Sequence, residues 1–155
     1  MIILDYLTAS RYLKIYDWAK KKNINIEDSL FPNQISAKLW LVSELKKFIN
    51  QDIPLNIDIV GSWYGWPLAG LLFDSFNINS INLYDIDNQA CFVSKMYSRI
   101  FNVEEKVNVV NKNYWNSSKK EQINLAINCS SEHMVETFSD YNHFNKDCIF
   151  VIQSN

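Results

Sequence analysis

Glycine is scarce in this chain. Only three glycines occur in 155 residues, and Gly61, Gly65 and Gly70 all fall within one short stretch. Glycine is favoured where the backbone needs a positive φ angle or where a ligand approaches the main chain closely. The sequence therefore predicts a special turn in this stretch.

Cysteine and histidine are also few. The three cysteines, Cys91, Cys129 and Cys148, are unevenly spaced, which argues against a disulfide framework and for a reducing compartment. With two histidines and no Cys-x-x-Cys pair, a zinc site is not expected, and we predict no bound metal.

Basic charge and long apolar runs are missing as well. The net charge is −2, whereas a generic nucleic-acid binder is normally basic. No apolar run approaches the ~20 residues needed to cross a bilayer, and residues 1–5 lack the basic region of a secretory signal. We therefore expect a cytoplasmic globular protein with no membrane partner and no generic nucleic-acid binding.

The glycine-containing stretch has the pattern of a strand, a turn and a helix. An apolar run, Ile57–Val60, breaks at Gly61, and helix-compatible residues resume at Pro67, since proline is favoured at the first position of a helix. In α/β proteins a nucleotide-like ligand lies at such a turn, near exposed backbone N–H groups.

A second strand-like run, Ile81–Tyr84, ends in Asp85 and Asp87. Asp85 lies twenty residues after Gly65, which is the spacing that brings an acid to the tip of the neighbouring parallel strand. A carboxylate there can accept two hydrogen bonds from a ribose diol. Asp87 is a favourable N-cap for the helix that follows.

Short apolar strands alternate with helical or polar segments along the rest of the chain, which predicts a parallel sheet covered on both faces. The expected strands are 56–60, 80–84, 107–111, 124–128 and 148–153. The expected helices are 8–22, 34–49, 67–76, one that starts at residue 87, and a short one over 131–138. Residues 113–120 are expected to form a polar loop.

The glycine turn, the acid after the second strand and the polar turns after the third and fourth strands resemble class I S-adenosylmethionine-dependent methyltransferases, in a compact phage- or bacterial-type form. The resemblance covers about residues 56–155. It implies a three-layer Rossmann-like α/β fold, with a mostly parallel sheet of about five strands in the order 3-2-1-4-5 and helices on both faces. We expect a single methyltransferase-like domain over 1–155, in which 1–52 form a two-helix extension and 53–155 the core.

The resemblance also implies S-adenosyl-L-methionine as the cofactor and a set of residues that contact it. The acid Asp85 would bind the ribose, Ile86 would pack on the adenine, and the remaining contacts would come from Gly61, Ser62, Trp63, Tyr64, Gly65, Asn113, Tyr114 and Asn128. The sequence does not identify the methyl acceptor.

The first motif departs from the family pattern, which reads acid-x-Gly-x-Gly-x-Gly. Trp63 stands where the middle glycine is expected, and the acid Asp58 lies one residue before the expected position, which is Ile59. Trp63 and Tyr64 therefore either stack on the ligand or alter the pocket.

Glu132 and His133 form the one adjacent acid–imidazole pair in the chain, so they are the candidate catalytic residues. Histidine titrates near neutral pH and is a natural general base. The alternative is that both are ordinary surface residues at the start of a helix.

Three functions fit the sequence. The first is methyl transfer, and the second is a catalytically inactive methyltransferase-like module that binds a ligand or a protein. The third is a dinucleotide-dependent oxidoreductase, which fits Asp85 but lacks the Gly-x-Gly-x-x-Gly turn of that class.

The family's sheet has seven strands, whereas this sequence ends at Gln153–Asn155, directly after the fifth. An apolar strand edge invites association. We therefore expect a truncated chain, a homo-oligomer formed through the edge of the fifth strand, or a rearranged end.

Overall fold

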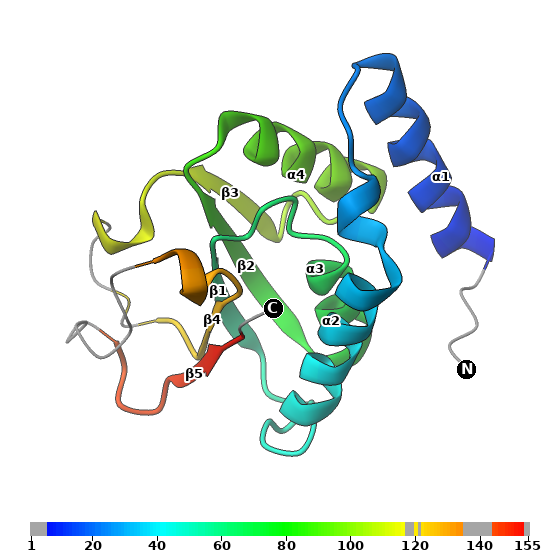
Figure 1. Cartoon of the computed structure of the whole chain (residues 1–155). Coiled ribbons are helices and arrows are strands. Elements are labelled where there is room, and N and C mark those ends of the chain that lie inside the picture. Colours follow the sequence, from blue (N-terminus) through cyan, green and yellow to red (C-terminus); the bar gives the residue numbers. More distant parts are fainter. Residues whose placement is uncertain (1–5, 117–119, 121, 135–143, 154–155) are drawn as a thin grey trace.

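The sheet has five parallel strands in the order β3-β2-β1-β4-β5 (Figure 1), which confirms the predicted α/β fold and strand order. The computed structural model describes residues 6–116, 120, 122–134 and 144–153. The strands are β1 (Leu55–Val60), β2 (Ile78–Asp85), β3 (Val107–Asn111), β4 (Leu125–Asn128) and β5 (Ile149–Ile152).

The helices begin and end close to the predicted positions. They are α1 (Tyr6–Lys21), α2 (Pro32–Leu45), α3 (Leu68–Ser75) and α4 (Asn88–Ile100), with 3-10 helices η1 (Glu27–Leu30), η2 (Tyr114–Asn116) and η3 (Ser131–His133). Asp87 caps α4 as predicted, because its Oδ1 accepts hydrogen bonds from the backbone N–H groups of Gln89 and Ala90. Of the helix predicted over 131–138, the first turn is η3, and residues 135–138 lie outside the described part.

One face of the sheet holds the main hydrophobic core and carries the four α-helices of the described residues, which lie on the same side of the strands in Figure 1. Helices were expected on both faces, and in the described part the second face carries the 3-10 helix η2 in place of an α-helix. Alternate residues of a strand point to opposite faces, and the apolar set of β1, β2 and β4 points to these helices. These buried strand residues are Ile57, Ile59, Ile81, Leu83, Leu125 and Ile127. Helices α1 and α2, which the sequence analysis assigns to an extension, contribute Ile15 and Leu41 to the same core.

The other face contains a smaller cluster with a buried charge. Asp58, on β1, is completely buried, and its Oδ2 lies 3.2 Å from the Nζ of Lys120. The same Oδ2 accepts a hydrogen bond from the hydroxyl of Tyr114, while Oδ1 accepts one from the Nδ2 of Asn82. The Lys120 ammonium also donates to the hydroxyl of Tyr84 at 2.6 Å. Asp58 is therefore a structural counter-ion of Lys120.

Strand β5 is one of the two edge strands of the sheet, and Ile152 is 60% exposed there. The predicted apolar edge is thus present in the structure, and a homo-oligomer formed through it stays a prediction. Among the described residues, no helix is long and apolar enough to cross a membrane.

Candidate functional site

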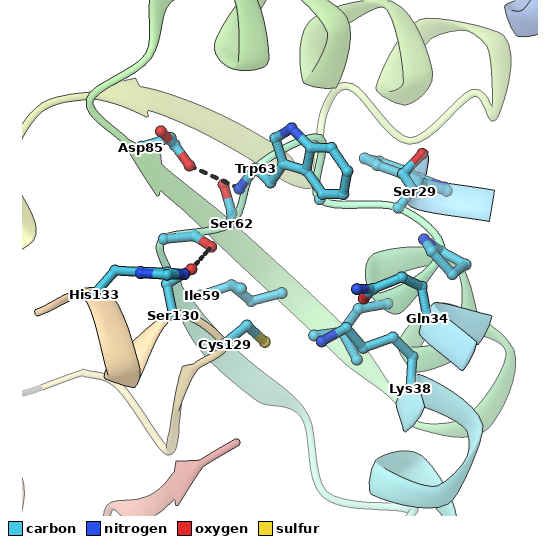
Figure 2. Close-up of a pocket in the computed structure, with 15 residues that line it drawn as sticks. Ser29, Gln34, Lys38, Ile59, Ser62, Trp63, Asp85, Cys129, Ser130 and His133 are labelled. Carbon is cyan, nitrogen blue, oxygen red and sulfur yellow. Dashed lines mark hydrogen bonds between the residues drawn. The ribbon is translucent and has the colours of Figure 1, made fainter. Parts of the chain in front are cut away.

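A cavity of about 370 Å³ lies at the carboxyl ends of β1, β2 and β4. The strand order reverses between β1 and β4, and ligands of open α/β sheets bind at such a switch point. Figure 2 shows the cavity between the strand ends and the helices η1 and α2. The residues that line it are Ser29, Gln34, Lys38, Ile59, Gly61, Ser62, Trp63, Gly65, Trp66, Pro67, Leu68, Asp85, Cys129, Ser130 and His133.

The glycine turn forms one wall of this cavity, and two of its glycines need their backbone freedom. Gly61 has φ +59° and Gly65 has φ +72°, in the left-handed region that glycine tolerates best. A Cβ atom on Gly61 would lie 2.7 Å from the Oγ of Ser130, and one on Gly65 would lie 2.6 Å from a methyl carbon of Leu83. The special turn predicted from the sequence is present.

We expect Gly61→Ala to destabilise the protein by more than about 1–2 kcal/mol, because the left-handed conformation alone costs that much for an L-residue and the new methyl group meets Ser130. Urea unfolding measures the change. Gly70→Ala is the matched control, since Gly70 lies in helix α3, outside the left-handed region, and a Cβ there would make a milder contact, 3.1 Å from the Nε1 of Trp66. Equal destabilisation by the two substitutions would contradict this reading of the turn.

Trp63 adopts a backbone conformation that is typical of glycine, with φ +50°. Its backbone N–H donates to the Oδ2 of Asp85 at 2.7 Å, and its carbonyl oxygen accepts from the Oγ of Ser94 at 3.1 Å. Its ring stacks on that of Tyr64, with centroids 4.6 Å apart. These contacts hold a bulky residue in the conformation of the glycine that it replaces, with the side chain 38% exposed at the cavity.

Asp85 lies where the sequence predicts it, at the end of β2, and lines the cavity. Its Oδ1 accepts the N–H of Asp87 at 2.9 Å, and its Oδ2 accepts the N–H of Trp63, which Figure 2 shows as a dashed line. Each carboxylate oxygen has two lone pairs. Asp85 therefore keeps one acceptor position on each oxygen for a ligand hydroxyl.

Five of the predicted ligand residues do not line the cavity, and Tyr64, Ile86 and Asn113 are the first three. Tyr64 is 6% exposed, and its hydroxyl donates to the carbonyl oxygen of Asn25. Ile86 is 77% exposed on the surface. Asn113 is exposed, and its Oδ1 accepts the backbone N–H of Trp115.

Tyr114 and Asn128 are also outside the cavity lining, and both are buried. Tyr114 packs on the second face of the sheet, where burial and its contact with Asp58 both raise the pKa of its hydroxyl. Asn128 accepts the backbone N–H of Ser130 and so shapes the turn after β4. Through these contacts, Tyr114 and Asn128 support the structure around the cavity.

Glu132 and His133 lie together in η3, with the Oε1 of Glu132 3.4 Å from the Nε2 of His133. His133 lines the cavity, and its side chain is 76% exposed. Glu132 is not among the lining residues. The imidazole is thus at the rim of the cavity, where a substrate can reach it.

Lys38 was not predicted as a site residue, yet it lines the cavity from α2 and is 9% exposed. A signal for it exists. Lys38 lies three, four and seven residues before the buried Leu41, Val42 and Leu45, so it belongs to the apolar stripe of the helix. A lysine in such a stripe is unusual, because lysine is rarely buried without a partner.

No protein-family model matches the sequence, and no curated protein matches it. Solved structures do match. A methyltransferase dependent on S-adenosylmethionine from Thiobacillus denitrificans, solved with S-adenosyl-L-homocysteine, has a TM-score of 0.61 and 12% identity over 76% of this chain and 47% of its own. YjhP from E. coli has a TM-score of 0.60 and 16% identity over 76% and 47%.

Geranyl diphosphate C-methyltransferase from Streptomyces coelicolor, solved with S-adenosyl-L-homocysteine, has a TM-score of 0.58 and 13% identity over 70% of this chain and 42% of its own. The matched part is thus a little under half the length of these three structures. The chain has the Rossmann-like fold of class I S-adenosylmethionine-dependent methyltransferases, and the resemblance predicted from its sequence is confirmed at the level of the fold.

Proposed function

We propose that this protein binds S-adenosyl-L-methionine in the cavity beside Asp85 and transfers its methyl group to an acceptor that is still to be identified. The observation that carries the proposal is the meeting of the glycine turn and Asp85 in one cavity at the switch point of a methyltransferase fold. The solved relatives from Thiobacillus and Streptomyces were crystallised with S-adenosyl-L-homocysteine, the product of such a transfer.

The described residues fit such a ligand. Asp85 retains free acceptor positions for the two ribose hydroxyls. The ring of Trp63 is an aromatic surface at the cavity, and an aromatic face attracts a cation such as a sulfonium. The predicted residues outside the cavity lining would then act around the site, in place of the direct contacts expected from the sequence. They are Tyr64, Ile86, Asn113, Tyr114 and Asn128.

Bound S-adenosylmethionine supplies a methyl group on a sulfonium that is already a good leaving group. The chain must therefore position the acceptor and, where the acceptor is neutral, remove a proton. His133 stands at the rim with an accessible imidazole, and Glu132 lies beside it to orient the ring and balance its charge after protonation.

A second candidate is a non-catalytic module with the same fold. Two features of the site favour it. Both oxygens of Asp85 already accept backbone N–H groups, and Trp63 occupies the place of a glycine at the cavity.

The cytoplasmic location expected from the sequence stays a prediction.

Transfer of a labelled methyl group separates the two candidates. We expect the wild-type protein to move label from S-adenosylmethionine to a component of the small-molecule or macromolecular fraction of a bacterial extract. His133→Ala is expected to lower this transfer about 10²- to 10⁴-fold, the usual contribution of a general base, and to leave binding of S-adenosylhomocysteine unchanged. Glu132→Gln keeps the imidazole and should lose less. Binding without any transfer by the wild type would favour the non-catalytic module.

A further inference from the structure

Lys38 is a buried cation in the candidate site. Its side chain is 9% exposed, and it lines the cavity from helix α2 (Figure 2). An uncompensated charge removed from water is energetically costly, so buried lysines usually have an acidic partner. The hydrogen-bond partners of Lys38 therefore decide whether its charge is neutralised within the protein.

These partners are neutral. The Nζ of Lys38 donates to the side-chain carbonyl oxygen of Gln153 at 2.7 Å. It also lies close to the thiol of Cys129, whose pKa is raised by burial and lowered in part by the Lys38 ammonium. Among the described residues, no carboxylate pairs with Lys38. Its positive charge thus has no counter-ion in this part of the chain.

Gln153 is fixed so that it aims the ammonium. It is 7% exposed, and its Nε2 donates to the carbonyl oxygen of Ala37 at 3.1 Å, which turns Oε1 toward Lys38. Its backbone N–H extends the ladder beyond β5 by donating to the carbonyl oxygen of Asn128 at 2.9 Å. An ammonium has three donors, of which one is used on Gln153 and a second faces the thiol of Cys129. A donor therefore remains for a ligand.

The cavity has opposite charges from different elements, with Asp85 at the end of β2 and Lys38 on α2. A ligand that matches both has hydroxyl groups for Asp85 and an anionic group for Lys38. We propose that Lys38, positioned by Gln153, is the anion-recognition residue of this cavity and binds a ligand carboxylate. The proposal rests on the proposed function, and the carboxylate can come from the amino-acid tail of the cofactor or from an acidic acceptor.

The first arm of the test uses Lys38→Met, which keeps most of the length of the side chain and removes its charge. Calorimetry compares S-adenosylhomocysteine with 5′-methylthioadenosine, which lacks the amino-acid tail. If the tail supplies the carboxylate, we expect the variant to lose about 10- to 100-fold in affinity for S-adenosylhomocysteine, as for a hydrogen bond to a charged group, with unchanged affinity for methylthioadenosine. Lys47→Met is the matched control, because Lys47 is an exposed lysine just after α2.

The second arm titrates acetate and inorganic phosphate into protein with and without S-adenosylhomocysteine, followed by tryptophan fluorescence. If an acceptor supplies the anion, the wild type binds these ions at least tenfold more tightly than Lys38→Met does. The proposal is overturned if the wild type and Lys38→Met have equal affinities in both arms. It is also overturned if Lys38→Met loses as much affinity for methylthioadenosine as for S-adenosylhomocysteine. Failure of the wild type to bind either adenosyl ligand would overturn the proposed function instead, while the ligand-free anion titration still decides the role of Lys38.

Discussion

Replacing Lys120 with methionine is expected to destabilise the protein by about 3–5 kcal/mol, because removal of one partner leaves the other charge buried and unpaired. The carboxylate of Asp58 is completely buried, and Lys120 is its one cationic partner among the described residues. Total stability of a domain is only about 5–15 kcal/mol, so this variant should be close to unfolding. The midpoint of urea denaturation measures the effect.

Two controls make the result specific to the buried pair. The double variant Asp58→Asn/Lys120→Met removes both charges, and we expect it to be more stable than Lys120→Met alone, since no unpaired charge remains. Lys47→Met removes an exposed ion-pair partner and should change stability by about 0.5 kcal/mol or less. A loss below about 1 kcal/mol for Lys120→Met would contradict the role of Lys120 as the counter-ion.

Replacing Asp85 with alanine is expected to weaken binding of S-adenosylhomocysteine about 10²-fold or more, because hydrogen bonds from two ribose hydroxyls to a carboxylate are among the stronger ones in proteins. The substitution also releases the N–H groups of Trp63 and Asp87 and so loosens the glycine turn. Asp85→Asn keeps the shape and one acceptor, and we expect an intermediate loss. Isothermal calorimetry measures both.

Asp87→Asn is the matched control for Asp85. Asp87 caps helix α4 outside the cavity lining, and asparagine caps a helix about as well as aspartate. Its affinity for S-adenosylhomocysteine should equal that of the wild type. If Asp85→Ala binds as tightly as Asp87→Asn, the ribose does not lie at Asp85.

The alternation of strands and helices and the glycine turn could be predicted because their signals are local, whereas the strand order was implied by the resemblance to the methyltransferase family. Apolar runs alternate with helical segments along the chain. Two of the three glycines, Gly61 and Gly65, occur where the backbone has a positive φ angle. Asp85 follows from its distance along the chain after that turn. The alternation of elements, the glycine turn and the position of Asp85 each depend only on residues that are close together in the sequence.

Side-chain partners distant in the sequence could not be predicted in the same way. Lys38 donates to Gln153, which lies 115 positions later in the chain. Asp58 on β1 pairs with Lys120, which lies in the segment between β3 and β4. Tyr114 was expected at the ligand, yet its hydroxyl turns to Asp58 on the other face of the sheet. Which face a side chain takes after a strand ends depends on the packing of the whole sheet.

The measurement that tests the account most directly is calorimetric titration of the folded wild-type protein with S-adenosylhomocysteine. We expect a dissociation constant in the micromolar range, which is roughly −8 kcal/mol of binding free energy, with a stoichiometry of one ligand per chain. NAD should not bind. Absence of binding by protein whose folding is verified by cooperative unfolding would contradict the central claim that the cavity beside Asp85 is an adenosyl-ligand site.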